Sequence, residues 1–140
     1  MVTSYERLAD AAFAAAMDIQ RQMQDKPSSF DGYRELVKLL EEPIVPNESY
    51  KLLYDARNLP LYRAAWSKAF GQAATEVKTD IFLKRVSDFL HQTLQNIEQG
   101  KPFKTEEMSK FCLALNQIFL QENAKQYAAN YRARMSNAAL

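Results

Sequence analysis

Hydrophobic residues recur along this chain at intervals of three and four, which is the spacing of α-helices that bury one face. The first such stretch begins at Thr3, which forms with Glu6 the sequence pattern of a capping box. Pro27 cannot continue a helix, so we predict a first helix from about residue 3 to 25. The apolar stripe of this helix is Tyr5, Leu8, Ala12, Ala15 and Ile19.

A second helix is predicted between Pro27 and Pro43, with Ser28 or Ser29 as its N-terminal cap. The following segment, PIVP, is expected to be an extended link, because residues that precede proline avoid the helical region. The buried face of the second helix is Tyr33, Leu36, Val37 and Leu40.

A short third helix is expected to begin at Asn47 and to break before Pro60. A fourth helix then starts at Pro60, since proline is favoured in a first helical turn. Two alternatives follow from Gly71: the chain bends between Gly71 and Thr79, or the fourth and fifth helices form one kinked rod. The third helix points Tyr50, Leu53 and Tyr54 inward, and the fourth has an aromatic stripe of Tyr62, Trp66, Ala69, Phe70 and Ala73.

Two longer helices complete the pattern. The fifth is predicted to run to about Gln99, where Gly100 provides a C-terminal stop. The sixth is predicted to follow a cap at Thr105. The core face of the fifth helix is Leu83, Val86, Leu90, Leu94 and Ile97, with Phe82 and Phe89 beside it, and that of the sixth is Met108, Phe111, Cys112, Leu115, Ile118 and Phe119.

These elements predict an all-α fold, a compact bundle of about five to six helices formed by a single domain over residues 1–140. The 140 residues include only three glycines and five prolines, and good helix formers such as Ala, Leu, Gln, Glu and Lys dominate. The clusters of Val, Ile and Thr that are typical of strands are absent.

Residues that carry out catalysis or hold metals are scarce. The chain has one histidine, His91, and one cysteine, Cys112, and neither stands in a CxxC, HExxH or Glu-x-x-His pattern. A glycine-rich phosphate loop and a GxSxG nucleophile elbow are also missing from the sequence. We therefore expect no metal, no cofactor and no enzymatic activity, with Cys112 buried in the core and His91 partly exposed on a helix.

The sequence predicts a cytoplasmic protein. No uncharged apolar run approaches the roughly 20 residues that cross a membrane, so no membrane partner is expected. The N-terminal stretch carries Glu6, Asp10 and Asp18, which is not the pattern of a signal peptide. A single cysteine excludes an intramolecular disulfide and suits a reducing compartment.

The formal net charge is +1, but the charges are unevenly distributed. The first 60 residues hold seven Lys and Arg against ten Asp and Glu, and the remaining 80 hold eleven against seven. Cations that line up along a helix can track a phosphate backbone without reading its sequence. The candidate nucleic-acid-binding residues are Arg57, Arg63, Lys68, Lys78, Lys84, Arg85, Lys125, Arg132 and Arg134.

Tyr127 and Tyr131 stand four residues apart in the basic C-terminal stretch KQYAANYRARM. Two interpretations of these tyrosines remain open at this point. They stack on bases or hydrogen-bond to phosphates, or they continue the buried stripe of the sixth helix. The neighbouring Arg132 and Arg134 also suit the negative end of a helix dipole, which is a purely local benefit.

Taken together, the chain resembles the small helical subunit of class 1 CRISPR interference complexes of the Cascade type, and its overall look favours the type I-D form. The helical pattern from Thr3 to Met135, the lack of catalytic groups and the nine basic residues named above carry the resemblance. The resemblance implies that several copies stack with other subunits along a guide-RNA filament and hold the target or displaced DNA strand by its backbone. Base pairing with the guide then reads the sequence. The near-neutral charge departs from the strongly basic face expected of such a subunit.

Two functions are therefore expected alternatives. The first is a non-enzymatic subunit that binds nucleic-acid backbone inside a CRISPR ribonucleoprotein, with further copies of itself and other subunits as partners. The second is a helical adaptor or regulator that binds protein partners only. Trp66, seven tyrosines and eight phenylalanines favour the second alternative, because such side chains anchor protein interfaces.

Overall fold

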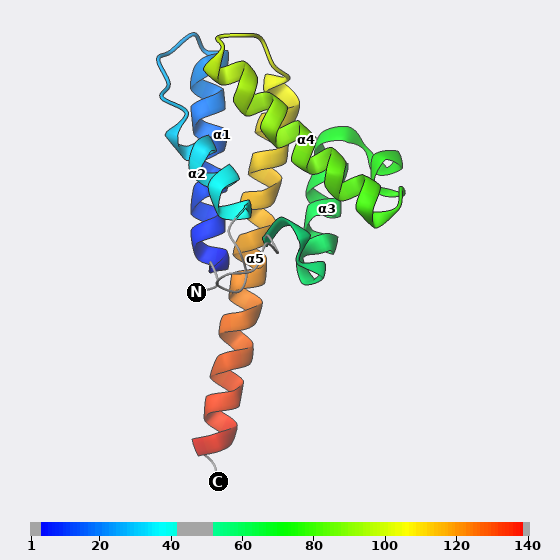
Figure 1. The fold of residues 1–140 in the computed structure, drawn as a ribbon. Helices are drawn as coiled ribbons and strands as arrows, with labels where there is room; N and C mark the ends of the chain where they lie inside the picture. Colours follow the sequence, from blue (N-terminus) through cyan, green and yellow to red (C-terminus); the bar gives the residue numbers. More distant parts are fainter. Residues whose placement is uncertain (1–3, 42–51, 139–140) are drawn as a thin grey trace.

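The computed structural model describes residues 4–41 and 52–138 of the chain. These residues form five α-helices and three short 3-10 turns and contain no strand (Figure 1), so the all-α prediction is confirmed. The α-helices are α1 Tyr5–Met23, α2 Asp31–Leu40, α3 Leu59–Phe70, α4 Thr79–Glu98 and α5 Thr105–Ala138, and the 3-10 turns are η1 Leu52–Tyr54, η2 Ala56–Asn58 and η3 Gln72–Thr75.

Helices α1 and α5 lie side by side at the centre of the fold (Figure 1). Small side chains make this close packing possible, and the alanines along α1 include Ala9, Ala12 and Ala16, which are fully buried. The amide Nδ2 of Asn116 on α5 donates a 2.9 Å hydrogen bond to the carbonyl oxygen of Ala9. Helix α2 packs on α1, and α3 packs on α5.

Helix α2 is capped by a residue from another helix, which corrects the prediction of a Ser28 or Ser29 cap. Phe30 occupies the N-cap position with a positive φ of 58° and caps nothing with its side chain. The carboxylate of Asp18 on α1 accepts hydrogen bonds from the backbone N–H groups of Gly32 (2.8 Å) and Tyr33 (3.3 Å). An anionic acceptor at the positive end of a helix is favourable, and here it also ties α2 to α1.

Gly32 lets α1 and α2 approach each other closely. A Cβ atom at this position would lie 2.6 Å from the carbonyl carbon and from the Cβ of Ala14, distances that only glycine avoids. The capping contact from Asp18 and the missing side chain at Gly32 therefore act together, because both require that the first turn of α2 rest on α1.

Several predicted boundaries are confirmed and several shift by a residue. Ser4 is the N-cap of α1, accepting a 3.2 Å hydrogen bond from the N–H of Arg7, whereas Thr3 lies outside the described residues. Thr105 is the first helical residue of α5 and not its cap. Gly71, with φ at 93°, separates α3 from α4, so the single kinked rod is wrong.

Gly100 ends α4 as predicted, by a Schellman motif. Its φ is 65°, the Lys101 N–H donates to the carbonyl of Asn96 (2.8 Å), and the Gly100 N–H donates to that of Ile97 (3.3 Å).

The short third helix is replaced by η1 and η2. Leu53 is buried as predicted, but Tyr54 is 38% exposed, which corrects its predicted inward position. With three residues per turn, neighbouring side chains of a 3-10 turn point about 120° apart, so burial of Leu53 directs Tyr54 to another side. The PIVP link, Asn47 and Tyr50 lie outside the described residues.

The core joins all five α-helices. Trp66 on α3 stacks on Phe70 at 4.4 Å between ring centroids and meets Phe82, Phe89 and Phe111 edge to face. Its indole N–H is the one buried side-chain polar atom of the described residues with no hydrogen-bond partner. The core face predicted for the sixth helix is confirmed in full, and those of the second, fourth and fifth helices hold except that Leu94, Ile97, Ala69 and Phe70 are half-buried and Ala73 is exposed.

Helix α5 continues beyond the body of the bundle as a single unsupported helix (Figure 1). Every residue from 124 to 137 is exposed except Ala128, which is half-buried. We call residues 124–138 the α5 overhang. The last part of α5 therefore does not belong to the compact bundle.

Candidate nucleic-acid interface

The structure distributes the nine predicted cations over two regions. Arg57, Arg63, Lys68, Lys78, Lys84 and Arg85 lie on η2, on α3 and at the start of α4, whereas Lys125, Arg132 and Arg134 lie on the α5 overhang. Figure 1 shows the overhang pointing away from the α3–α4 corner. The nine residues therefore do not form one continuous patch.

Four of the nine are engaged within the fold. Arg57 forms a forked pair with Asp55, in which Nη2 lies 2.7 Å from Oδ2, and this hydrogen bonding lowers the pKa of the Asp55 carboxyl. Arg63 donates a 3.1 Å hydrogen bond to the carbonyl of Val77 and stands over the ring of Phe82. The other two engaged cations are Lys84, 3.1 Å from Asp88, and Lys125, 4.0 Å from Glu122.

The other five are exposed and form no ion pair with the described residues: Lys68, Lys78, Arg85, Arg132 and Arg134. Such side chains keep their full charge available to an external anion. An engaged cation must first leave its carboxylate or carbonyl, which reduces what it contributes to binding.

Two of the available cations continue into a line of aromatic and amide side chains on α4. Lys78 precedes the helix, and Arg85, Phe89, Gln92 and Asn96 follow at spacings of seven, four, three and four residues. These spacings place Arg85, Phe89, Gln92 and Asn96 along one face of α4, and Lys78 is the N-cap residue of the helix. We call these five residues the α4 track.

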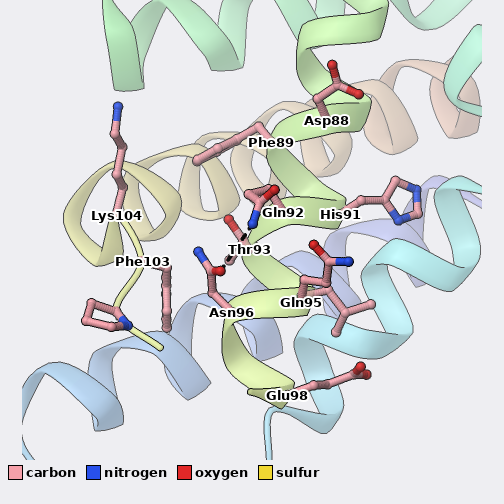
Figure 2. A pocket seen from close by; sticks show the side chains of 12 residues that line it. Asp88, Phe89, His91, Gln92, Thr93, Gln95, Asn96, Glu98, Phe103 and Lys104 are labelled. Atoms are coloured by element: carbon pink, nitrogen blue, oxygen red, sulfur yellow. Dashed lines mark hydrogen bonds between the residues drawn. The ribbon is translucent and has the colours of Figure 1, made fainter. Parts of the chain in front are cut away.

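The far half of the α4 track forms one wall of an open hollow of about 910 Å³ between α4 and the start of α5. Figure 2 shows Phe89, Gln92 and Asn96 on α4 directed toward the side on which Phe103 and Lys104 lie. The Nε2 of Gln92 donates a 3.2 Å hydrogen bond to Oδ1 of Asn96. We call the space bounded by these five residues the α4–α5 hollow.

The hollow is also lined by His91, which lies at its edge toward α2. Figure 2 shows His91 directed toward α2, and its Nε2 pairs with the carboxylate of Glu41 at the end of α2. His91 is 46% exposed, which confirms its predicted partly exposed position. Two carboxylates also line the hollow: Asp88 is paired with Lys84, and Glu98 points away from Phe103.

Residue-by-residue sequence reasoning missed the α4–α5 hollow. Gln92 and Asn96 are uncharged, and Phe103 lies in a loop where no helical stripe includes it. One signal was available: Arg85, Phe89, Gln92 and Asn96 share the spacing of one helical face, which borders the core stripe at Phe89. Only the tertiary structure places Phe103 across from them.

The α5 overhang carries an exposed apolar stripe. Tyr127 is 74% and Tyr131 56% exposed, so the interpretation that they continue the core stripe is wrong. With Leu120 and Met135 they lie on the side of α5 roughly opposite the buried Leu115. We call Leu120, Tyr127, Tyr131 and Met135 the overhang stripe.

The described residues offer no metal-binding cluster. They contain no group of three or more His, Cys, Asp and Glu side chains that could hold a metal ion. Cys112 is fully buried, as predicted, and burial raises the pKa of its thiol well above the ordinary value. A thiol that stays protonated and out of reach of solvent is unreactive. Within the described ranges, no helix has the length and apolar character needed to cross a membrane.

Comparison of the chain with protein-family models, with curated proteins and with solved structures finds no match.

Proposed function

We propose that this chain is a non-enzymatic helical subunit that binds nucleic-acid backbone within a multisubunit CRISPR ribonucleoprotein of the Cascade type. The observation that carries the proposal is the α4 track, where Lys78 at the N-cap of α4 and Arg85, seven residues further along, are both exposed and unpaired with any described carboxylate. The resemblance of the sequence to such subunits supports the proposed assembly, and the positions of Lys78 and Arg85 support the proposed binding face.

The spacing of the two cations suits a strand of phosphates. Seven helical residues advance about 10 Å along the axis, a distance that spans about three nucleotides at the 3.4 Å rise of one strand of a duplex. Contacts of this kind depend on the backbone and not on the bases. The guide RNA then supplies the sequence specificity by base pairing.

A net charge of +1 fits a subunit that binds weakly alone and works by repetition. Two or three phosphate contacts per copy give little affinity by themselves. Several copies held along one filament would raise the effective concentration of each site for the same strand, so that weak contacts add. Other subunits and further copies of this chain are therefore the proposed partners.

Replacing Lys78 and Arg85 together with alanine is expected to weaken binding to a short single strand and to flatten its salt dependence. Loss of two phosphate contacts on a single strand lowers the slope of log K against log salt by about 1.4. Fluorescence anisotropy of a labelled oligonucleotide, measured at several salt concentrations from low ionic strength upward, gives this slope directly.

The matched control replaces Arg21 and Lys38 with alanine, which removes the same charge from exposed positions on α1 and α2. The control variant should retain the slope of the unmodified chain. Equal slopes for all three proteins would refute the α4 track as the binding face. An equal decrease of the slope in both variants would mean that only the net charge of the protein matters, which would also refute it.

A second candidate function, an adaptor that binds protein, is favoured by the overhang stripe. Tyrosine and methionine side chains exposed in a row on a lone helix are typical anchors for a protein groove. Replacing Tyr127, Tyr131 and Met135 with alanine is expected to abolish copurification of a defined protein partner while circular dichroism stays helical. Arg132→Ala with Arg134→Ala serves as the control, because it leaves the stripe intact. Retention of the partner by the triple variant would exclude the stripe as its anchor.

A further inference from the structure

We propose that the α4–α5 hollow accepts one unpaired base of a nucleic-acid strand whose backbone lies along Lys78 and Arg85. This inference rests on the proposed function. It adds that a base is bound beside the two cations that hold the backbone. The hollow begins where the cations end, one turn of α4 after Arg85.

The two aromatic rings of the hollow are half-buried and held in place by other rings. Phe89 meets Phe70 at 5.1 Å and Trp66 at 5.4 Å between centroids, both edge to face. Phe103 meets Phe30 edge to face at 6.1 Å. Rings fixed in this way lose little freedom when a base stacks on them, and stacking on aromatic side chains tolerates every base.

The amide pair between the rings has unused hydrogen-bonding capacity. Because Gln92 donates from Nε2 to Oδ1 of Asn96, Oε1 of Gln92 remains as an acceptor and Nδ2 of Asn96 as a donor. A neighbouring acceptor and donor is the arrangement by which Asn and Gln side chains contact base edges. Every base offers both a donor and an acceptor on its pairing edge, so such a site binds a base without selecting one.

The charges around the hollow permit a nucleotide. Lys104 stands on its rim across from α4 (Figure 2), and Arg85 lies one turn before Phe89. Of the two carboxylates that line the hollow, Asp88 is offset by Lys84 at 3.1 Å, and Glu98 points away from Phe103 (Figure 2). Lys104 and Arg85 therefore supply positive charge for the phosphate of a nucleotide on two sides of the hollow. The hollow is open to solvent, so the attached base can enter it.

The first test titrates the full chain with adenosine monophosphate and, separately, with ribose 5-phosphate, which lacks the base. Nuclear magnetic resonance is expected to show shifts at Gln92, Asn96 and Phe103 with the nucleotide and much smaller shifts with the sugar phosphate. Equal shifts with both would assign the hollow to phosphate alone and overturn the base site. Absence of shifts at these residues would overturn it as well.

The second test compares a short single strand with an abasic strand of the same length and charge. The intact strand is expected to bind at least about fivefold more tightly, the lower end of what stacking of one base contributes. Gln92→Ala with Asn96→Ala should remove most of this difference, and so should Phe103→Ala. The amide variant alters an exposed side chain and a half-buried polar one, neither of them in the core, and remains informative if Phe103→Ala fails to fold. Gln117→Ala, at an exposed position of α5 that does not line the hollow, is the control.

The outcomes separate this inference from the proposed function. Equal affinity for intact and abasic strands, with a salt slope that depends on Lys78 and Arg85, keeps the backbone interface and removes the base site. Nucleotide shifts in the hollow without any salt-dependent strand binding keep the site and remove the backbone role. A phenylalanine-containing peptide that shifts the same signals more strongly than the nucleotide would assign the hollow to protein and overturn the inference.

Discussion

Replacement of Phe119 with alanine is expected to lower the free energy of unfolding by about 3–5 kcal/mol, the usual cost of removing a buried aromatic ring. Phe119 is fully buried in α5. Its ring stacks on Tyr5 of α1 at 6.0 Å and meets Tyr62 of α3 at 6.5 Å. The side chain thus joins three helices at one point, and its loss leaves a cavity that rigid helices close only in part.

The neighbouring residue provides a matched control for this prediction. Leu120 is 47% exposed and lies on the other side of the same turn, so Leu120→Ala should change the free energy of unfolding by less than about 1 kcal/mol. Urea unfolding followed by far-ultraviolet circular dichroism measures both variants. Similar losses for the two would mean that α5 is not packed against α1 and α3 as described.

A steep loss of stability above pH 9 is the second large effect expected. Burial raises the pKa of the Cys112 thiol and of the Tyr33 and Tyr62 hydroxyls above their ordinary values of 9.0 and 10.0. In the unfolded chain these groups ionise near the ordinary values, while in the native protein they stay protonated. Their contribution to stability is therefore complete below pH 9 and is lost as the pH rises through the range between the unfolded and the native pKa values.

The size of this effect follows from proton linkage. Each group costs about 1.4 kcal/mol for each pH unit above its unfolded pKa. Between pH 8 and pH 11 the three groups together lower the free energy of unfolding by about 5 kcal/mol, which is comparable to the whole stability of a small domain. Urea unfolding at pH 8, 9, 10 and 11 in the presence of a reductant tests the prediction.

Cys112→Ala isolates the earliest part of the alkaline transition. The variant should be less stable at pH 8, because a buried side chain is smaller, but its stability should fall less between pH 9 and pH 10 than that of the unmodified chain. The two tyrosines are half ionised at pH 10 in the unfolded chain, so the loss above pH 10 should remain. A constant free energy of unfolding from pH 8 to 11 in the unmodified chain would contradict the burial of all three groups.

The periodicity of apolar residues was sufficient to predict the all-α class and most helix boundaries. A helix buries one face, so its core residues must recur every three to four positions, and this constraint is visible without a structure. The six predicted core positions of the last helix, including Phe111 and Phe119, are all buried. Gly100 was predicted as a helix end, and a bend at Gly71 was one of two predicted alternatives. Both glycines have positive φ values in the structure, a conformation that is unfavourable for other residues.

Contacts between distant parts of the chain were beyond the reach of the sequence. Asp18 caps α2 across a gap of 14 residues, and no local rule links a carboxylate in one helix to the N-terminus of the next. Tyr127 and Tyr131 illustrate the same limit from the other side. Their spacing is compatible with a buried stripe. They are exposed because α5 extends beyond α1 and α3, the helices on which it packs.

The candidate site divides in the same way. The sequence by itself predicted that Lys78 and Arg85 share a helical face, because the period of an α-helix is a local property. The structure places Arg85 in α4 and Lys78 at its N-cap, with extended backbone. Whether a cation is available depends on its neighbours in space: Arg63 is held by the Val77 carbonyl and Lys84 by Asp88, whereas Arg85 has no described ion-pair partner. The tertiary structure alone brings Phe103 across from α4 and makes the hollow, since that contact is set by how the chain turns at Gly100 and not by any spacing along it.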